Sequence, residues 1–179
     1  MTVVNEFLSA SVRVFEYHKR LADRAVEQVS DDRLHVALDQ NTNSIAVVMK
    51  HIAGNLLSRW TDVLTSDGEK PWRDRDSEFE DQFRSRKELI EYWERGWACL
   101  FDSLKSLSAE DFEKTIMIRG EPHSVPLALE RSVGHICYHI GQIVMIARIQ
   151  AGDNWQVLTV PKGGSREFNQ ANWGTSSNR

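Results

Sequence analysis

The sequence from Pro126 to Gly152, PLALERSVGHICYHIGQIVMIARIQAG, has the features of one long and mostly buried helix. Proline suits the first turn of a helix, and glycine suits the position just after its last turn. Isoleucine and valine recur through most of the turns between them, so the apolar surface is wide enough to face several neighbours. Such a helix requires partner helices elsewhere in the chain.

Three other stretches supply these partners. Apolar residues recur with helical spacing from about Asn5 to Val29, from about Ser44 to Leu64 and from Ser85 to about Leu107. Ser44 and Ser85 are suited to cap the second and third of these helices, and Glu88 completes a capping box with Ser85. The sequence therefore predicts an all-α fold, a four-helix bundle.

Two smaller features complete the predicted fold. Thr115–Arg119 and Ser124-Val125 flank Gly120–His123, a pattern that predicts a small β-hairpin before the last helix. Residues 153–179 have no helical period and are expected to form an extended C-terminal tail. Because the tail contains apolar side chains from Trp155 onward, we expect it to be ordered and to pack on the bundle, where it would cover the open side of the candidate site described below. The alternative is that the tail packs on a second copy of the chain. The chain is thus expected to be a single domain, with the bundle in residues 1–152.

Composition excludes several classes of protein. The chain has 179 residues and a net charge of −4, which argues against a nucleic-acid-binding surface. The N-terminus does not resemble a signal peptide, and no apolar run approaches the roughly 18 residues that cross a bilayer. Cys99 and Cys137 cannot form a disulfide framework, and we interpret both as reduced, buried thiols. A cytoplasmic protein that binds neither membranes nor nucleic acids is expected.

Two histidines of the last helix are candidates for chemistry. His135 and His139 lie four residues apart, so their side chains share one face of the helix. Two imidazoles at this spacing can bind one metal ion. The alternative is a pair of core histidines that form hydrogen bonds with carbonyls or carboxylates, since burying them without partners would be costly.

A third histidine on the second helix favours the metal site. His51 follows an apolar block, and in bundles the ligands come from inward-facing positions on facing helices. Three imidazoles with an open fourth position are typical of a catalytic metal site. Asn55 and Gln142, one turn from His51 and His139, are expected to line the same pocket, either bonding the ligand histidines or contacting substrate.

The other histidines are less suited to this role. His18 is interpreted as a hydrogen-bonded core residue of the first helix rather than a fourth ligand. His35 and His123 fall in predicted connectors and are expected to face solvent.

The histidine pattern resembles the DinB-like superfamily of metal-binding four-helix bundles. The motifs are His51-x-x-x-Asn55 and, far downstream, His135-x-x-x-His139-x-Gly-Gln142, and the resemblance covers about residues 5–152. Three further stretches resemble a bacterial subgroup of unassigned activity: Ser58–Trp60, Asp67–Arg73 and Lys162–Phe168.

This resemblance implies a function. It implies a divalent ion, nickel or zinc, held by His51, His135 and His139 with water completing the shell. Relatives include enzymes that use bacillithiol, mycothiol or similar small thiols, so a transferase acting on a small thiol and an electrophile is expected. The alternatives are a metal-dependent hydrolase and a non-catalytic metal-binding or stress-response protein. Dimers among relatives imply a homodimer.

Overall fold

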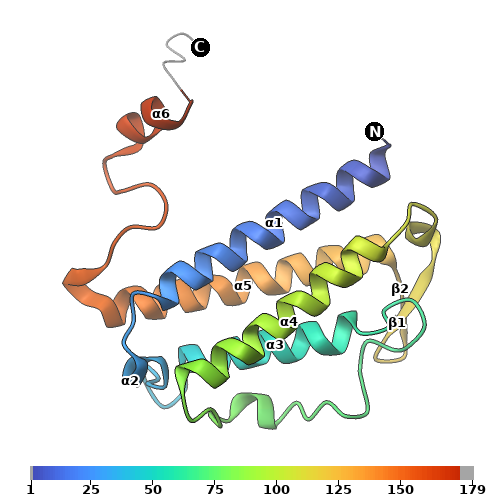
Figure 1. Cartoon of the computed structure of the whole chain (residues 1–179), viewed down its shortest axis with the longest axis horizontal. Helices are drawn as coiled ribbons and strands as arrows, with labels where there is room; N and C mark the ends of the chain where they lie inside the picture. The colour runs from blue at the N-terminus through green and yellow to red at the C-terminus, as the bar shows by residue number, and fades with distance from the viewer. Residues whose placement is uncertain (1, 174–179) are drawn as a thin grey trace.

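The structure, a computed structural model, describes residues 2–173 and has four long helices arranged as a bundle (Figure 1). The long helices are α1 (Val3–Val26), α3 (Ile45–Trp60), α4 (Arg86–Ser106) and α5 (Val125–Ala151). The shorter elements are α2 (Asp31–Leu34), the 3-10 helices η1 (Ser77–Phe79), η2 (Glu110–Glu113) and η3 (Gly152–Asn154), the strands β1 (Thr115–Ile118) and β2 (Glu121–Ser124), and α6 (Ser165–Trp173). The predicted bundle, with a hairpin before its last long helix, is confirmed.

Side-chain caps define where the long helices begin. The hydroxyl oxygens of Ser44 and Ser85 accept hydrogen bonds from Val47 N at 3.2 Å and Glu88 N at 3.3 Å, as predicted. The second helix is shorter than predicted and ends at Trp60 rather than near Leu64. The chain turns there because Asp62 adopts a left-handed backbone conformation, with φ of 49°, that a helix cannot continue through.

The pairing of α3 with α4 is especially close. Trp60 of α3 and Trp93 and Trp97 of α4 are completely or almost completely buried in the core. Gly96 allows the two backbones to approach, because a Cβ added there would lie 2.7 Å from Ala53 Cα. This approach fixes the position of α3, the helix that carries His51.

We expect Gly96→Ala to destabilise the protein. The new methyl group meets the backbone of Ala53, and overpacking of this kind costs about 1–3 kcal/mol, more than the roughly 1 kcal/mol that alanine gains over glycine in a helix. Gly134→Ala in α5 is the matched control, since a Cβ there meets nothing within 4 Å. Thermal unfolding should therefore shift down for Gly96→Ala and stay or shift up for Gly134→Ala. Equal shifts would contradict this account of the α3–α4 contact.

The hairpin differs in detail from its prediction. β1 and β2 pair antiparallel from Thr115 opposite Ser124 to Ile118 opposite Glu121. The connection is therefore the pair Arg119-Gly120, with φ of 57° and 73°, rather than Gly120–His123. Two consecutive positive φ angles match the twist of a two-residue hairpin turn, which is why the tight connection prevails.

The tail differs more strongly from its prediction, because α6 is helical. Gly163 and Gly164 interrupt the chain, and the helix formers Arg166, Glu167 and Gln170 follow them. The sequence of α6 is too short to show a clear period, which explains why the helix was not predicted.

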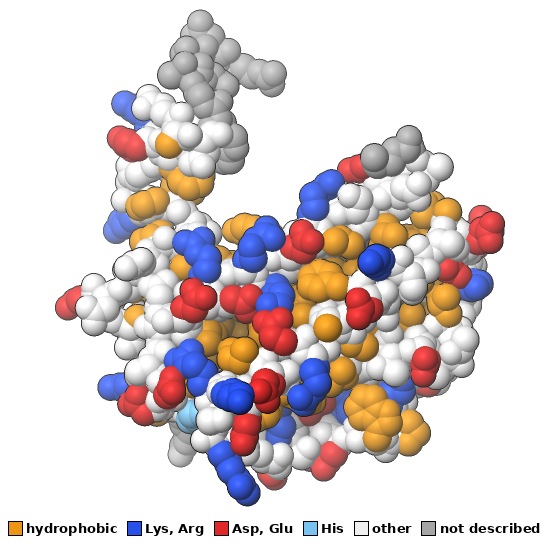
Figure 2. Space-filling view, in the orientation of Figure 1, with side chains coloured by type: hydrophobic (Ala, Val, Ile, Leu, Met, Phe, Trp, Pro, Cys, Tyr) orange, Lys and Arg blue, Asp and Glu red, His pale blue; other side chains and the backbone are white. Residues whose placement is uncertain are grey.

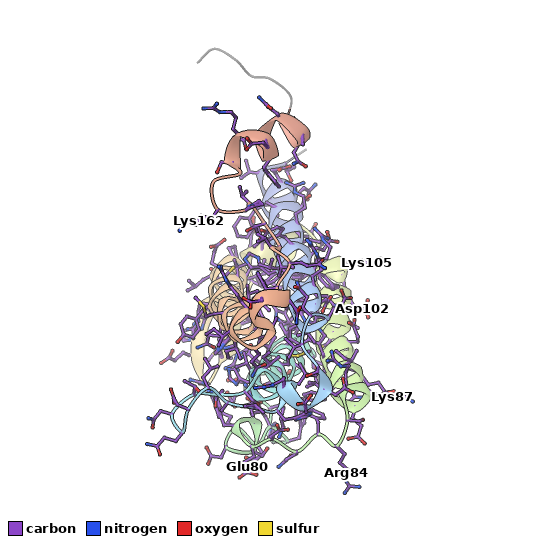
Figure 3. All side chains as sticks on the ribbon, turned by 90° about the vertical axis from the view of Figure 1, so that its left-hand side faces the viewer. Glu80, Arg84, Lys87, Asp102, Lys105 and Lys162 are labelled. Atoms are coloured by element: carbon purple, nitrogen blue, oxygen red, sulfur yellow. The ribbon has the colours of Figure 1, made fainter. Side chains whose placement is uncertain are left out.

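Only the first part of the tail is seen to pack on the bundle. Trp155 and Leu158 pack partly buried against the core, and Gln156 N donates to Gln28 Oε1 at the end of α1. Beyond this point the chain stands away from the bundle as an arm (Figures 1 and 2). Lys162 on the arm lies well above Glu80, which is in the connector at the bottom of the view (Figure 3). The Trp173 side chain and residues 174–179, which the predicted tail includes, lie outside the described residues.

The outer surfaces of the helices carry many charged side chains. Acidic and basic side chains are interspersed over the face of α1 and α4 shown in Figure 2. Within residues 2–173, no helix combines the length and the apolar character needed to traverse a bilayer.

Candidate metal centre

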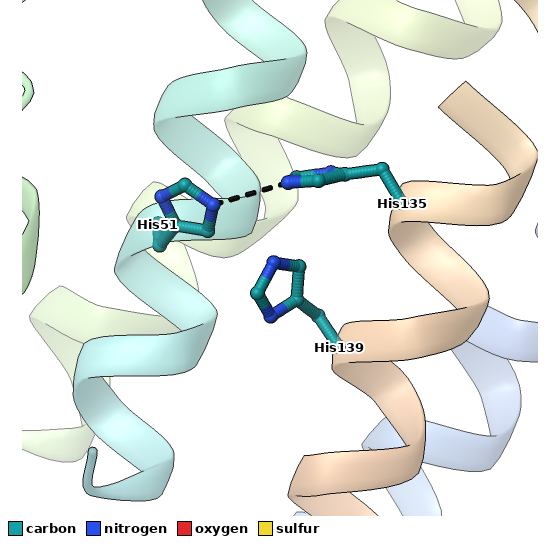
Figure 4. Close-up of side chains that lie close together, drawn as sticks. All are labelled: His51, His135 and His139. Carbon is teal, nitrogen blue, oxygen red and sulfur yellow. Dashed lines mark hydrogen bonds between the residues drawn. The ribbon is translucent and has the colours of Figure 1, made fainter. Parts of the chain in front are cut away.

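Three imidazoles meet between α3 and α5, as the sequence predicted (Figure 4). His51 comes from the middle of α3, and His135 and His139 come from consecutive turns of α5. One ring nitrogen from each lies within 4.8 Å of the others. These three side chains form the histidine centre, which could hold a metal ion.

The spacing of the nitrogens suits a shared ion. His51 Nε2 and His135 Nε2 are 3.1 Å apart. Two nitrogens bound to one ion at about 2.1 Å, with an angle of about 90–110° between them, lie roughly 3.0–3.4 Å apart. The observed separation falls in that range, so His51 and His135 fit one coordination shell without rearrangement of their helices.

Hydrogen bonds on the outer side of the centre favour, in two of the rings, the tautomer that carries its proton on Nδ1. His51 Nδ1–H donates to Glu78 Oε2 at 3.0 Å, and His139 Nδ1–H donates to Gln142 Oε1 at 2.7 Å. With the proton on Nδ1, the Nε2 lone pair of each ring is free. Hydrogen-bond partners of this kind orient histidine ligands in metal proteins. Gln142 therefore bonds a candidate ligand, which is one of the two roles expected for it.

Glu78 was not identified from the sequence, yet it is central to the site. Its carboxylate is buried and also accepts from Arg73 Nε at 2.7 Å and Arg73 Nη2 at 2.9 Å. Burial alone would raise the pKa of Glu78, but the hydrogen bonds from His51 and Arg73 outweigh burial and the pKa is lowered. Glu78 is therefore a carboxylate that holds His51 in place.

Two residues of α3 make room for Glu78 and fix its segment. A Cβ at Gly54 would lie 2.5 Å from Glu78 Oε1, so only glycine leaves space for the carboxylate. The buried Lys50 donates from Nζ to Glu80 O at 3.1 Å and to Gln82 Oε1 at 2.9 Å, on the chain that follows Glu78. The long connector between α3 and α4 is thus attached to the helix that carries His51.

Burial also keeps the rings of α5 neutral. Burial, with the neighbouring His139 and His51, lowers the pKa of His135 to about 3. Burial lowers the pKa of His139 as well, although the hydrogen bond with Gln142 opposes it. Neutral imidazole is the form that binds a metal, so the surroundings favour the ligand form over a wide pH range.

This shift predicts a pH dependence of stability in the metal-free protein. The pKa of His135 is about 3 when folded and about 6.5 when unfolded. Between these pH values the unfolded chain binds more protons than the folded chain. The contribution of His135 to the free energy of unfolding is therefore greatest above pH 6.5. It falls as the pH decreases, by at most about 1.4 kcal/mol per pH unit. The free energy of unfolding in urea should decrease less between pH 7 and pH 5 for His135→Gln than for wild type. The same loss in both proteins would contradict this origin.

A cavity of about 180 Å³ opens beside the histidine centre. His51 and His135 form part of its wall, and Asn55 lines it next to His51, as predicted. Apolar side chains, one serine and four arginines form the remaining wall: Trp60, Val63, Ile116, Ile118, Ala128, Ser132, Arg59, Arg75, Arg119 and Arg131. His51 and His135 of the centre therefore face a small cavity.

The other histidines lie away from this centre. His18 Nδ1 is 2.8 Å from Val14 O within α1, which agrees with its predicted hydrogen-bonded role. His123 is not solvent-facing as predicted but buried on β2, because its ring inserts between Glu121 O and Arg131. Both cysteines are free and partly buried.

Comparison with known proteins gives one result. The chain matches a family model described as a protein of unknown function (DUF1572) over residues 2–164. No curated protein and no solved structure matches it. The matched span contains the four long helices, the hairpin, the histidine centre and Glu78, and it ends just before α6. The chain belongs to the DUF1572 family.

Proposed function

We propose that this protein is a divalent-metal-dependent enzyme that joins a small thiol to an electrophile, with the ion held by His51, His135 and His139. The observation that carries the proposal is a set of three converging imidazoles, two of them oriented by hydrogen bonds from Nδ1, beside a cavity. Three protein ligands and an open side are typical of catalytic sites, whereas structural sites are closed by a fourth ligand.

The choice of metal and of thiol chemistry rests on the donor set and on the histidine pattern. Imidazole nitrogen suits zinc and nickel, which are the ions we propose. The spacing His51-x-x-x-Asn55 and His135-x-x-x-His139 supports membership of the DinB-like superfamily, some of whose members are thiol-dependent enzymes. A bound ion of this kind lowers the pKa of a coordinated thiol and so supplies a thiolate at neutral pH.

The chain itself positions the reactants. Glu78 and Gln142 hold two ligand rings in one orientation, and the apolar wall of the cavity excludes water from the reacting carbon. In the proposed reaction the thiol loses its proton to solvent and the sulfur electron pair forms a bond to carbon. The leaving group then departs with its own bonding pair, so the charges balance.

The test is a conjugation assay with protein purified without an affinity tag and loaded with zinc or nickel. Bacillithiol, mycothiol, glutathione and cysteine are each offered with monobromobimane, and formation of the thioether is followed by fluorescence. We expect acceleration by wild type and by His18→Ala, whose ring lies outside the centre, and none by His135→Ala.

Other outcomes separate the alternatives. Metal-loaded protein that hydrolyses p-nitrophenyl acetate but accelerates no conjugation would favour the hydrolase. Metal-loaded protein without either activity would favour a non-catalytic metal-binding protein, and the thiol-transfer proposal would then be wrong. Homodimer formation and a cytoplasmic location remain predictions.

A further inference from the structure

The cavity beside the histidine centre has an excess of positive charge. Arg59, Arg75, Arg119 and Arg131 line it, and they come from four separate segments: α3, the connector, the hairpin turn and α5. Among the described residues that line the cavity, none is an aspartate or glutamate. Four guanidinium groups from separate segments form a concentrated positive region, which attracts anions.

The acidic partner of these arginines neutralises only part of this charge. Glu69 Oε2 is 3.3 Å from Arg59 Nη1, 3.3 Å from Arg75 Nη1 and 3.2 Å from Arg119 Nε. One carboxylate thus faces three guanidinium groups. Arg131 contacts the ring of His123, whose Nδ1–H donates to a backbone carbonyl, leaving a neutral Nε2 to accept from the arginine. The positive charge in the cavity therefore exceeds the negative charge.

The hairpin turn that carries Arg119 is held firmly. Asp67 Oδ1 accepts from Arg119 N at 2.8 Å, and Asp67 Oδ2 accepts from Gly120 N at 2.7 Å. Arg119 has a φ of 57°, a backbone conformation that residues other than glycine and asparagine seldom adopt. A fixed turn presents the guanidinium at a defined place and reduces the entropy lost when it binds a ligand.

The size and walls of the cavity indicate the kind of anion. A cavity of about 150 Å³ holds a molecule the size of benzene, so the 180 Å³ space suits a compact ligand. Trp60, Ile116 and Ile118 provide an apolar wall that fits a short carbon chain better than a hydrated inorganic ion. A planar carboxylate matches the fork of hydrogen-bond donors on arginine.

We propose that the cavity binds a small organic carboxylate, with its anionic group on Arg59, Arg119 and Arg131 and its other end toward His51 and His135. This inference rests on the proposed function in one respect, since it makes this acid the electrophile. The anion site adds a substrate class to the thiol-transfer proposal. The electrophile is a short carboxylic acid whose reactive carbon lies next to the histidine centre.

Succinate, with succinamide as its uncharged counterpart, tests the binding site by isothermal titration calorimetry on the full chain. We expect succinate to bind and succinamide to bind at least about tenfold more weakly. Arg119→Gln and Arg131→Gln should each weaken the binding of succinate about tenfold or more. Arg13→Gln is the matched control, because Arg13 pairs with Glu6 on the exposed face of α1, and should leave the affinity unchanged.

A second measurement locates the bound acid. In protein loaded with Co²⁺, the proton relaxation of succinate should increase, and His135→Ala should abolish the increase while calorimetric binding persists. Inorganic phosphate that binds more tightly than succinate would overturn the carboxylate assignment. So would equal affinities for succinate and succinamide, or succinate affinity insensitive to both arginine substitutions.

The outcomes also separate this inference from the proposed function. Metal-loaded protein that conjugates thiols but does not bind succinate would overturn the inference and leave the function standing. Arginine-dependent succinate binding by a protein that holds no metal would support the anion site and overturn the proposed function.

Discussion

Substitution of His51 by alanine is expected to abolish stoichiometric metal binding. Wild-type protein should bind about one zinc or nickel ion per chain, because three imidazole nitrogens converge within 4.8 Å. His51→Ala removes the α3 donor and leaves two rings on one helix, which cannot surround the ion. Equilibrium dialysis followed by elemental analysis measures the change.

The control for this prediction is another histidine of the bundle. His18→Ala removes an imidazole that contacts Val14 O within α1, and it should keep the metal content of the wild type. His135→Ala and His139→Ala should behave like His51→Ala. A triple variant lacking all three rings that still binds one ion tightly would disprove the histidine centre as the metal site.

The second large effect is expected at Glu78. In metal-free protein, Glu78→Ala leaves the nearly inaccessible Arg73 without its principal ion-pair partner, and breaking a buried pair in this way costs about 3–5 kcal/mol of stability. His51 also loses its hydrogen-bond acceptor, so the metal affinity of the folded protein should fall about 10–100-fold. Urea unfolding without metal and metal titration of the folded protein measure the two effects separately.

Glu80→Gln provides the comparison in the same segment. Glu80 is exposed, and its side chain contacts Gln82 rather than the histidine centre, so its substitution should change stability by less than about 0.5 kcal/mol. Glu78→Gln keeps the shape of the side chain, so its loss of stability should lie between those of Glu78→Ala and Glu80→Gln. If Glu78→Ala is no more destabilised than Glu80→Gln, the ion pair with Arg73 contributes little to the fold.

The helices and the histidines could be predicted because both depend on local spacing. A four-residue interval places His135 and His139 on one face whatever the rest of the chain does. His51 followed from its position in an apolar helix that had to face α5. The caps Ser44 and Ser85 were equally local, and their hydrogen bonds are present in the structure.

Glu78 and the cavity arginines could not be predicted in the same way. Glu78 lies in a connector without a repeating pattern, and its position depends on Gly54 and on the contacts of Lys50, which only the folded chain brings together. The arginines come from four segments, so no single stretch of sequence shows the cluster. The length of the connector, its two aromatic residues and its alternating charges are the sequence features that favour its packing on the bundle.

If the histidine centre holds an ion as proposed, the separation of its ligands along the chain would link metal supply to the lifetime of the protein. His51 and His135 are 84 residues apart, and the connector, α4 and the hairpin must all be placed before their rings meet. An unfolded chain therefore offers no preformed centre, and an ion bound by the folded chain stabilises it in proportion to the logarithm of the metal concentration. Under metal starvation more chains would unfold and become accessible to proteases, so the amount of this protein would follow the supply of its ion.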